Sequence, residues 1–184
     1  MQFKFAIVGG GLTATAMLCQ FVNSVRDKAE KGLLGPEKIE IQIYEKQDEF
    51  GPGFPHNDTF ALPFHITNMC ASDMGILVDR PEDFQDWVIK KSDDLQKRFS
   101  YFYDLNSELN GSRHECNHYP RAIMGAYLKT RFEEMVQSAR MAGLAVNLYP
   151  ASEVVDIKQN ADVISLGIKD LSSGTCFSND VGRV

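Results

Sequence analysis

The chain has 184 residues, a net charge of −6 and 43% hydrophobic residues. This is the length of one ordinary domain, and the apolar share suffices for a real core. The acidic balance, without any block of like charges, excludes the basic surface that nucleic-acid binding requires. We find no apolar stretch long enough for a membrane span and no signal-peptide pattern, so no membrane partner is expected.

The cysteines are scattered along the chain. They are Cys19, Cys70, Cys116 and Cys176, and no two of them form a CxxC pair. This pattern favours free thiols in a reducing compartment, and we therefore expect a cytoplasmic protein.

A short apolar run from Phe5 to Val8 opens the chain and is typical of a buried parallel strand. A glycine turn and an amphipathic helical pattern follow at once, which is the context of a dinucleotide-binding motif. The predicted cofactor-binding residues of this motif are Gly9, Gly10, Gly11, Leu12, Thr13 and Ala14. Two alternatives stay open: a strand-to-helix turn without a ligand, and a different nucleotide-type ligand.

The roles within this motif follow from side-chain size. Gly9 allows the tight turn, Gly11 lets a pyrophosphate approach the backbone, and Ala14 lets the helix pack closely on the strand. The helix N-terminus then offers free N–H groups and a positive dipole end to the phosphates. The motif therefore predicts binding of FAD or NAD(P).

An acidic residue follows the second predicted strand. The first helix is expected from Leu12 to about Lys31 and the second strand from Ile39 to Tyr44, directly before Glu45. An acid at this position accepts hydrogen bonds from the ribose hydroxyls and repels a 2′-phosphate, which favours FAD or NAD over NADP. We count Lys46 with the cofactor-binding residues; the alternative for Glu45 is an ordinary solvated acid.

The middle of the chain does not read as a simple βαβ crossover. Residues 51–77 are turn-rich and lack clear periodicity, which is often a sign of function. Short helices are expected at Pro81–Ile89 and Asp93–Phe99, and residues 100–117 look like a polar loop. His56 and His65 lie in or near the irregular segment, where a general-base role competes with that of an ordinary loop histidine.

The C-terminal third predicts a helix, a strand and a meander. The helix runs from Pro120 to about Ala142, and Leu144–Tyr149 reads as a third parallel strand. Turns are expected at Gln159-Asn160 and at residues 172–174. The three short antiparallel strands of the meander are expected at Glu153–Lys158, Val163–Lys169 and Thr175–Phe177. Residues 182–184 look like the start of a further strand.

With these motifs the chain resembles the FAD-NAD(P)-binding proteins of the flavin monooxygenase-like group, which are related to FAD-dependent hydroxylases. The resemblance covers nearly the whole chain, and its middle motifs are more specific than the glycine motif. The stretches that carry it are Gly9–Ala14, Tyr44–Lys46, Phe50–Phe54, Ile66–Met69, Pro81–Trp87 and Pro120–Leu128.

The resemblance implies further contacts with FAD. It places Asn68 and Met69 near the flavin, Arg121 near the pyrophosphate or ribityl chain, and Val154 at the adenine through its backbone. These residue types suit the roles, because an arginine fork fits a phosphate and an amide can both donate to and accept from a flavin edge. The resemblance names no catalytic residue.

Two features of the family are not found in the sequence: the turn that closes over the flavin nucleotide, and the NADPH-binding half. We therefore expect residues 1–184 to form a single FAD/NAD(P)-binding domain, an N-terminal fragment of a larger flavoprotein that is inactive alone. No metal site is expected, because His114, Cys116 and His118 lack an obvious fourth ligand.

The predicted fold is α/β: a Rossmann-like FAD-binding domain with a parallel sheet, a β-meander and helical insertions. The predicted function is the FAD-binding portion of a flavin-dependent oxidoreductase, a monooxygenase that uses NAD(P)H as co-substrate. A non-catalytic FAD- or NAD-binding module and an NAD-dependent dehydrogenase are the alternatives. The substrate and the oligomeric state are not predicted.

Overall fold

The structure, a computed structural model, describes residues 2–33, 38–109, 117–160 and 163–182. Its described strands form two sheets of three strands each. The strands are β1 (Gln2–Val8), β2 (Lys38–Tyr44), β3 (Ala145–Tyr149), β4 (Ser152–Asn160), β5 (Val163–Asp170) and β6 (Cys176–Val181). The α-helices are α1 (Leu12–Glu30), α2 (Gly53–His56), α3 (Asp83–Lys90), α4 (Ser92–Arg98), α5 (Ser100–Leu109) and α6 (Arg121–Met141).

The first sheet is parallel, with β2 between β1 and β3. Its register pairs Val8 with Tyr44 and Tyr44 with Tyr149, so the carboxyl ends of all three strands meet at one edge. Ligands of open α/β sheets bind outside this edge. The residues directly after the strands, which include the glycine turn and Glu45, are therefore brought together.

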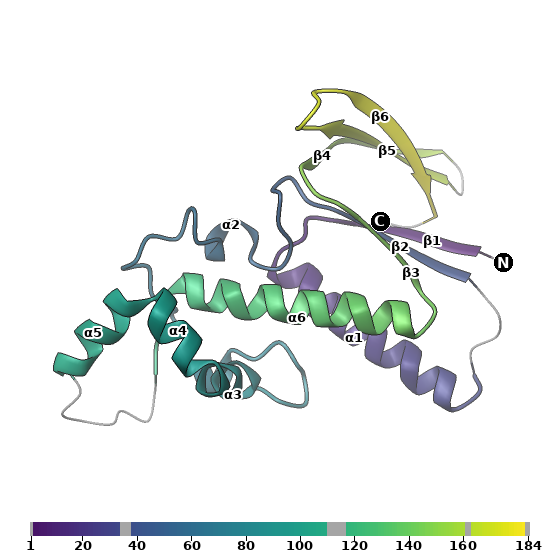
Figure 1. Cartoon of the computed structure of the whole chain (residues 1–184). Coiled ribbons are helices and arrows are strands. Elements are labelled where there is room, and N and C mark those ends of the chain that lie inside the picture. Colours follow the sequence, from purple (N-terminus) through teal and green to yellow (C-terminus); the bar gives the residue numbers. More distant parts are fainter. Residues whose placement is uncertain (1, 34–37, 110–116, 161–162, 183–184) are drawn as a thin grey trace.

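The two long helices cover one face of the parallel sheet, and the meander lies on the other side (Figure 1). Leu18 and Val22 of α1 and Phe132 of α6 bury their side chains against Ile41 and Ile43 of β2. On the meander side, Leu166 and Ile168 form a smaller core with Ala6 and Tyr44. The α/β fold with a parallel sheet and a meander is thus confirmed.

A further core holds the short helices against the N-terminal half of α6. Phe84 and Trp87 of α3 pack with Ile123 and Tyr127 of α6, and Phe102 of α5 lies partly buried against this cluster. The prediction of a loop over residues 100–117 is wrong for Ser100–Leu109, which is helical. Packing of its aromatic residues on this core outweighs the weak helix propensity of its polar residues; residues 110–116 lie outside the described part.

The meander differs from its prediction in its bounds. The turn expected at Gln159-Asn160 is wrong, because β4 pairs with β5 as far as Asn160. The last strand extends to Val181, four residues beyond the expected Phe177. After it, the Gly182 amide donates to the Lys4 carbonyl of β1 at 2.8 Å. The further strand expected at residues 182–184 falls mainly on residues outside the described part.

The cysteine prediction is partly wrong. Cys19 and Cys176 are free, but Cys70 is disulfide-bonded, a pairing that depends on distances which sequence spacing does not reveal. Cys116 lies outside the described residues. Cys19 is a fully buried core side chain, and this burial raises the pKa of its thiol to about 11. In the part of the chain that the structure describes, no helix is long and apolar enough to cross a membrane, and no cluster of possible metal ligands occurs.

Candidate cofactor site

The glycine turn leaves β1 at the sheet edge and leads into α1. Gly9 has a φ of +93°, and its amide donates to the Tyr44 carbonyl at 2.8 Å. A side chain at Gly9 would meet no atom within 4 Å, so the backbone here faces open space. The first helical hydrogen bond of α1 runs from the Thr15 amide to the Gly11 carbonyl at 3.0 Å, and the first turn contains no acidic residue. The N–H groups of Leu12, Thr13 and Ala14 have no hydrogen-bond partner among the described residues, so they are available to an anion.

The Glu45 side chain stabilises the glycine turn through hydrogen bonds to backbone amides. This side chain is buried, with 7% exposed, and one carboxylate oxygen accepts the Gly10 amide at 2.5 Å. The other oxygen accepts the Gln47 amide at 2.9 Å. A carboxylate that accepts backbone N–H groups is strongly hydrogen-bonded. Glu45 therefore fixes the conformation of the turn, whereas its predicted contact with a ribose stays a prediction.

The loop at Phe50–Gly53 closes over the turn. The Gly51 amide donates to the Gly10 carbonyl at 2.7 Å. A Cβ at Gly10 would come within 2.6 Å of the Phe50 ring, and one at Gly11 within 3.2 Å of the Gly53 Cα. A side chain at Gly10 would therefore force the Phe50 ring to move, whereas one at Gly11 would make a tight contact with the loop.

These elements line a pocket of about 560 Å³, which we call the glycine-turn pocket. Its lining residues are Ala6, Ile7, Val8, Gly9, Gly11, Leu12, Thr13, Ala14, Met17, Pro52, Gly53, Pro55 and His56. Five of the predicted cofactor residues are among them: Gly9, Gly11, Leu12, Thr13 and Ala14. Pro52, Gly53, Pro55 and His56 were not among the predicted cofactor-binding residues, although the turn-rich run from Gly51 to His56 indicated an unusual loop and part of it carries the family resemblance.

Two other predicted residues lie toward the meander. Lys46 is exposed and forms an ion pair with Glu153 of β4 at 2.7 Å. Val154, the next residue of β4, is half-buried beside the core of the meander. Neither lines the glycine-turn pocket.

The remaining predicted residues lie on two segments that pair at the N-terminus of α6. An isolated bridge joins Ile66 to Pro120, and the Arg121 amide donates to the His65 carbonyl at 2.7 Å. This bridge brings the segment with Asn68 and Met69, both exposed, next to the helix that begins at Arg121. Their predicted contacts with FAD came only from the resemblance, and none of these three residues lines the glycine-turn pocket.

His56 lines the glycine-turn pocket and lies close enough to Arg121 to feel its charge. Burial lowers the pKa of the His56 imidazole, and the nearby Arg121 charge lowers it further. The ring is therefore neutral at pH 7. Within the described part of the chain the Arg121 guanidinium forms no ion pair, so it remains available to an anion.

Residues 6–175 match the sequence pattern of the family described as FAD-NAD(P)-binding. The chain belongs to this family. The match includes the glycine turn, Glu45 and the first two strands of the meander. It confirms the predicted family resemblance and FAD and NAD(P) as its cofactor class.

This FAD-NAD(P)-binding chain is also similar to a curated protein, the uncharacterized protein YdhS of Escherichia coli (strain K12). The two are 26% identical over 173 residues, which are 94% of this chain and 28% of YdhS. The chain thus spans less than a third of the curated relative that it matches.

The chain is also similar to parts of solved protein structures, at low sequence identity. The reduced form of the ornithine hydroxylase PvdA from Pseudomonas aeruginosa matches with a TM-score of 0.48 and 12% identity, over 98% of this chain and 37% of that one. The bacillithiol disulfide reductase Bdr from Bacillus cereus matches with a TM-score of 0.46 and 11% identity, over 99% of this chain and 38% of that one.

Proposed function

We propose that residues 1–184 form one FAD-binding domain of a flavin-dependent oxidoreductase. This oxidoreductase is a monooxygenase with NAD(P)H as its co-substrate. The glycine-turn pocket carries the proposal. It presents an open backbone at Gly9 and a first helical turn without acidic residues, at the edge of a parallel sheet. These are the features that a dinucleotide pyrophosphate requires. The monooxygenase reaction itself is supported by the sequence resemblance of the middle motifs.

In this proposal the residues of the chain bind and orient the cofactor. The amides of Leu12, Thr13 and Ala14 hold the pyrophosphate, and the side chain of Glu45 keeps the turn in place while facing the ribose. Bound FAD would supply hydride acceptance and oxygen activation, which the side chains themselves cannot supply.

The other predicted contacts are assigned by position. Arg121 contributes positive charge near the flavin nucleotide, Asn68 and Met69 contact the flavin side, and the Val154 backbone meets the adenine. Lys46, held by Glu153 at 2.7 Å, is placed near the ribose side of Glu45. NAD(P)H oxidation belongs to the longer protein in this proposal, and its absence there would favour a binding or sensing module.

Thr13→Glu tests the pyrophosphate site without disturbing the helix. Thr13 is exposed in the first turn of α1, where a carboxylate improves the interaction with the helix dipole. The same carboxylate would repel the cofactor's pyrophosphate. We expect Thr13→Glu to reduce FAD affinity at least tenfold with no loss of thermal stability, as measured by flavin fluorescence titration and by thermal unfolding.

Thr13→Gln is the matched control, because it has the same shape without the charge. It should keep FAD affinity within about threefold of the wild type. Wild-type affinity in both variants would contradict the location of the pyrophosphate, whereas an equal loss of affinity in both would indicate a steric effect.

A further inference from the structure

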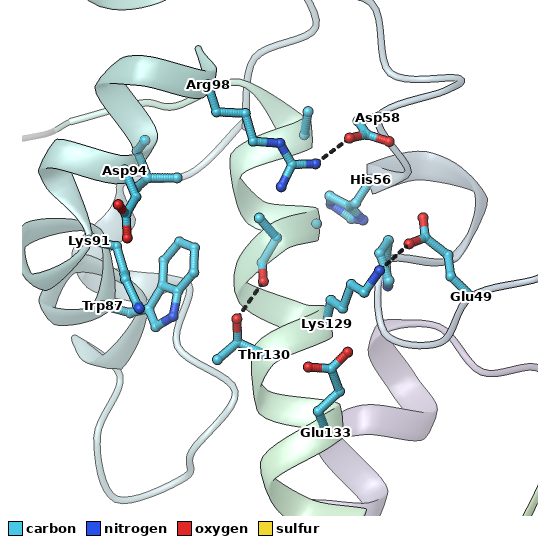
Figure 2. A pocket seen from close by; sticks show the side chains of 15 residues that line it. Glu49, His56, Asp58, Trp87, Lys91, Asp94, Arg98, Lys129, Thr130 and Glu133 are labelled. Atoms are coloured by element: carbon cyan, nitrogen blue, oxygen red, sulfur yellow. Dashed lines mark hydrogen bonds and ion pairs between the residues drawn. The ribbon is translucent and has the colours of Figure 1, made fainter.

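Residues 49–58, which we call the wall loop, form one side of the glycine-turn pocket. The loop residues that line the pocket are Pro52, Gly53, Pro55 and His56. On its other side the wall loop borders a second pocket of about 300 Å³, which Figure 2 shows between this loop and the helices α3 and α4. The position of the wall loop therefore determines the shape of the glycine-turn pocket.

Two backbone contacts place the wall loop against the glycine turn. The Gly51 amide donates to the Gly10 carbonyl at 2.7 Å. Gly53 packs so closely that a Cβ on it would come within 3.0 Å of the Gly11 Cα. Ordering a loop costs conformational entropy. Bonds that join the two ends of the wall loop therefore help to keep these contacts in place.

The Asn57 side chain joins the two ends of the wall loop. Asn57 is buried, with 4% exposed, and its Nδ2 donates to Oε1 of Gln47 at 3.2 Å and to Oε1 of Glu49 at 2.5 Å. Its Oδ1 accepts the Thr59 amide at 2.8 Å. Both N–H groups and the oxygen of this amide are thus used. Because Gln47 and Glu49 precede α2 and Asn57 follows it, these bonds close the base of the loop.

The partners of Asn57 connect it to the glycine turn and to α6. The Gln47 backbone amide donates at 2.9 Å to Glu45, whose other carboxylate oxygen stabilises the glycine turn. Glu49 pairs with Lys129 of α6 at 3.0 Å (Figure 2). Asn57 is therefore the junction of a hydrogen-bonded chain that runs from the glycine turn to α6.

We infer that Asn57 is a positioning residue for the cofactor, because it holds the wall loop on the glycine turn in the geometry that admits the pyrophosphate. This inference rests on the proposed binding of FAD in the glycine-turn pocket. Asn57 does not line that pocket itself, so it acts through the loop residues that do. An asparagine amide suits this place because it offers two donors and an acceptor, whereas a carboxylate only accepts.

Asn57→Asp tests this role with little change in shape. The new carboxylate cannot donate and is repelled by Glu49. FAD affinity of the full chain is measured by flavin fluorescence titration, and hydrogen exchange of the Gly51 amide is measured by NMR without cofactor. We expect FAD affinity to fall at least tenfold and the Gly51 amide to exchange at least tenfold faster. Asn57→Ser removes the amide without adding a charge and should give smaller changes in the same direction.

Exchanging the two partners should restore the contact. In the double variant Asn57→Asp/Glu49→Gln, the new amide at position 49 donates to the new carboxylate at position 57, so donor and acceptor are reversed and the net charge is that of the wild type. We expect FAD affinity and Gly51 exchange to return to within about threefold of the wild type.

Asn147→Asp is the matched control. Asn147 of β3 also donates its amide to a carboxylate, that of Glu40, at 3.0 Å, but this contact is exposed and does not line the glycine-turn pocket. The same substitution there adds the same charge and the same repulsion. It should leave FAD affinity and Gly51 exchange unchanged.

Wild-type FAD affinity in Asn57→Asp overturns the inference. So does a failure of the double variant to recover affinity and exchange, or an equal effect of Asn147→Asp. If Asn57→Asp does not fold, Asn57→Ser and the double variant carry the same test. A wild-type chain that binds no FAD would instead contradict the proposed function, and the Gly51 exchange of the same variants then decides whether Asn57 holds the wall loop.

Discussion

Single buried acids illustrate what a sequence can and cannot predict about this molecule. The apolar run that ends at Tyr44 predicts Glu45 directly after the second strand, and in the structure β2 ends at Tyr44. Its partners, the Gly10 and Gln47 amides, could not be predicted, because they depend on how the turn folds back over the sheet edge. Asp83 gave no signal at all in the sequence, yet it is fully buried.

Asp83 ties α3 to α6 through charged hydrogen bonds. It accepts from the Tyr127 hydroxyl at 2.7 Å and from two nitrogens of Arg131, each at 2.8 Å. We expect Asp83→Ala to lower the free energy of unfolding by about 3 kcal/mol, because it leaves the largely buried Arg131 without its main partner. Urea denaturation measures this change.

Asp86→Ala is the control for that prediction. Asp86 lies on the same helix and forms an exposed ion pair with Arg80, so its loss should cost less than about 1 kcal/mol. Equal costs for the two variants would contradict the assigned importance of the buried network.

At the scale of elements, periodicity predicted the two long helices well. α1 and α6 have apolar faces at helical spacing, and glycines follow both of them. α5 was missed because its polar residues resemble a loop and its aromatic residues gain their stability from a core elsewhere in the chain. The approach of α2 to α6 was also missed, although it shapes both pockets.

Gly125→Ala tests the contact between α2 and α6. Alanine favours a helix over glycine by about 1 kcal/mol. The added Cβ would nevertheless come within 2.0 Å of the His56 carbonyl oxygen, which is a backbone atom. We expect a net loss of about 1–3 kcal/mol in thermal or urea unfolding, as for other overpacked sites.

Gln137→Ala provides the matched control in the same helix. Gln137 is exposed and lies near the C-terminal end of α6, whereas Gly125 lies near its N-terminal end. Its effect should stay within about 0.5 kcal/mol. A gain of stability in Gly125→Ala would show that α2 moves away from α6 at little cost.

At the scale of the whole molecule, the order of elements was predictable and their joint arrangement was not. Alternating strands and helices predicted a parallel sheet, and the three late strands predicted a meander. The resemblance implies that Asn68 and Met69 lie near the flavin and Arg121 near the pyrophosphate or ribityl chain, and these contacts stay predictions. The bridge from Ile66 to Pro120, which joins the two segments that carry them, could not be predicted from the sequence. The glycine-turn pocket combines the predicted motif with the loop at Pro52–His56, which only the folded chain brings to it.

The most direct test of the account is the visible absorption spectrum of the purified chain, after saturation with FAD and removal of the excess. We predict flavin bands at about one equivalent of FAD per chain, because the glycine turn presents its open backbone and helix N-terminus to the cofactor. A folded chain, verified by circular dichroism, that stays colourless and does not alter FAD fluorescence in a titration would contradict the central claim.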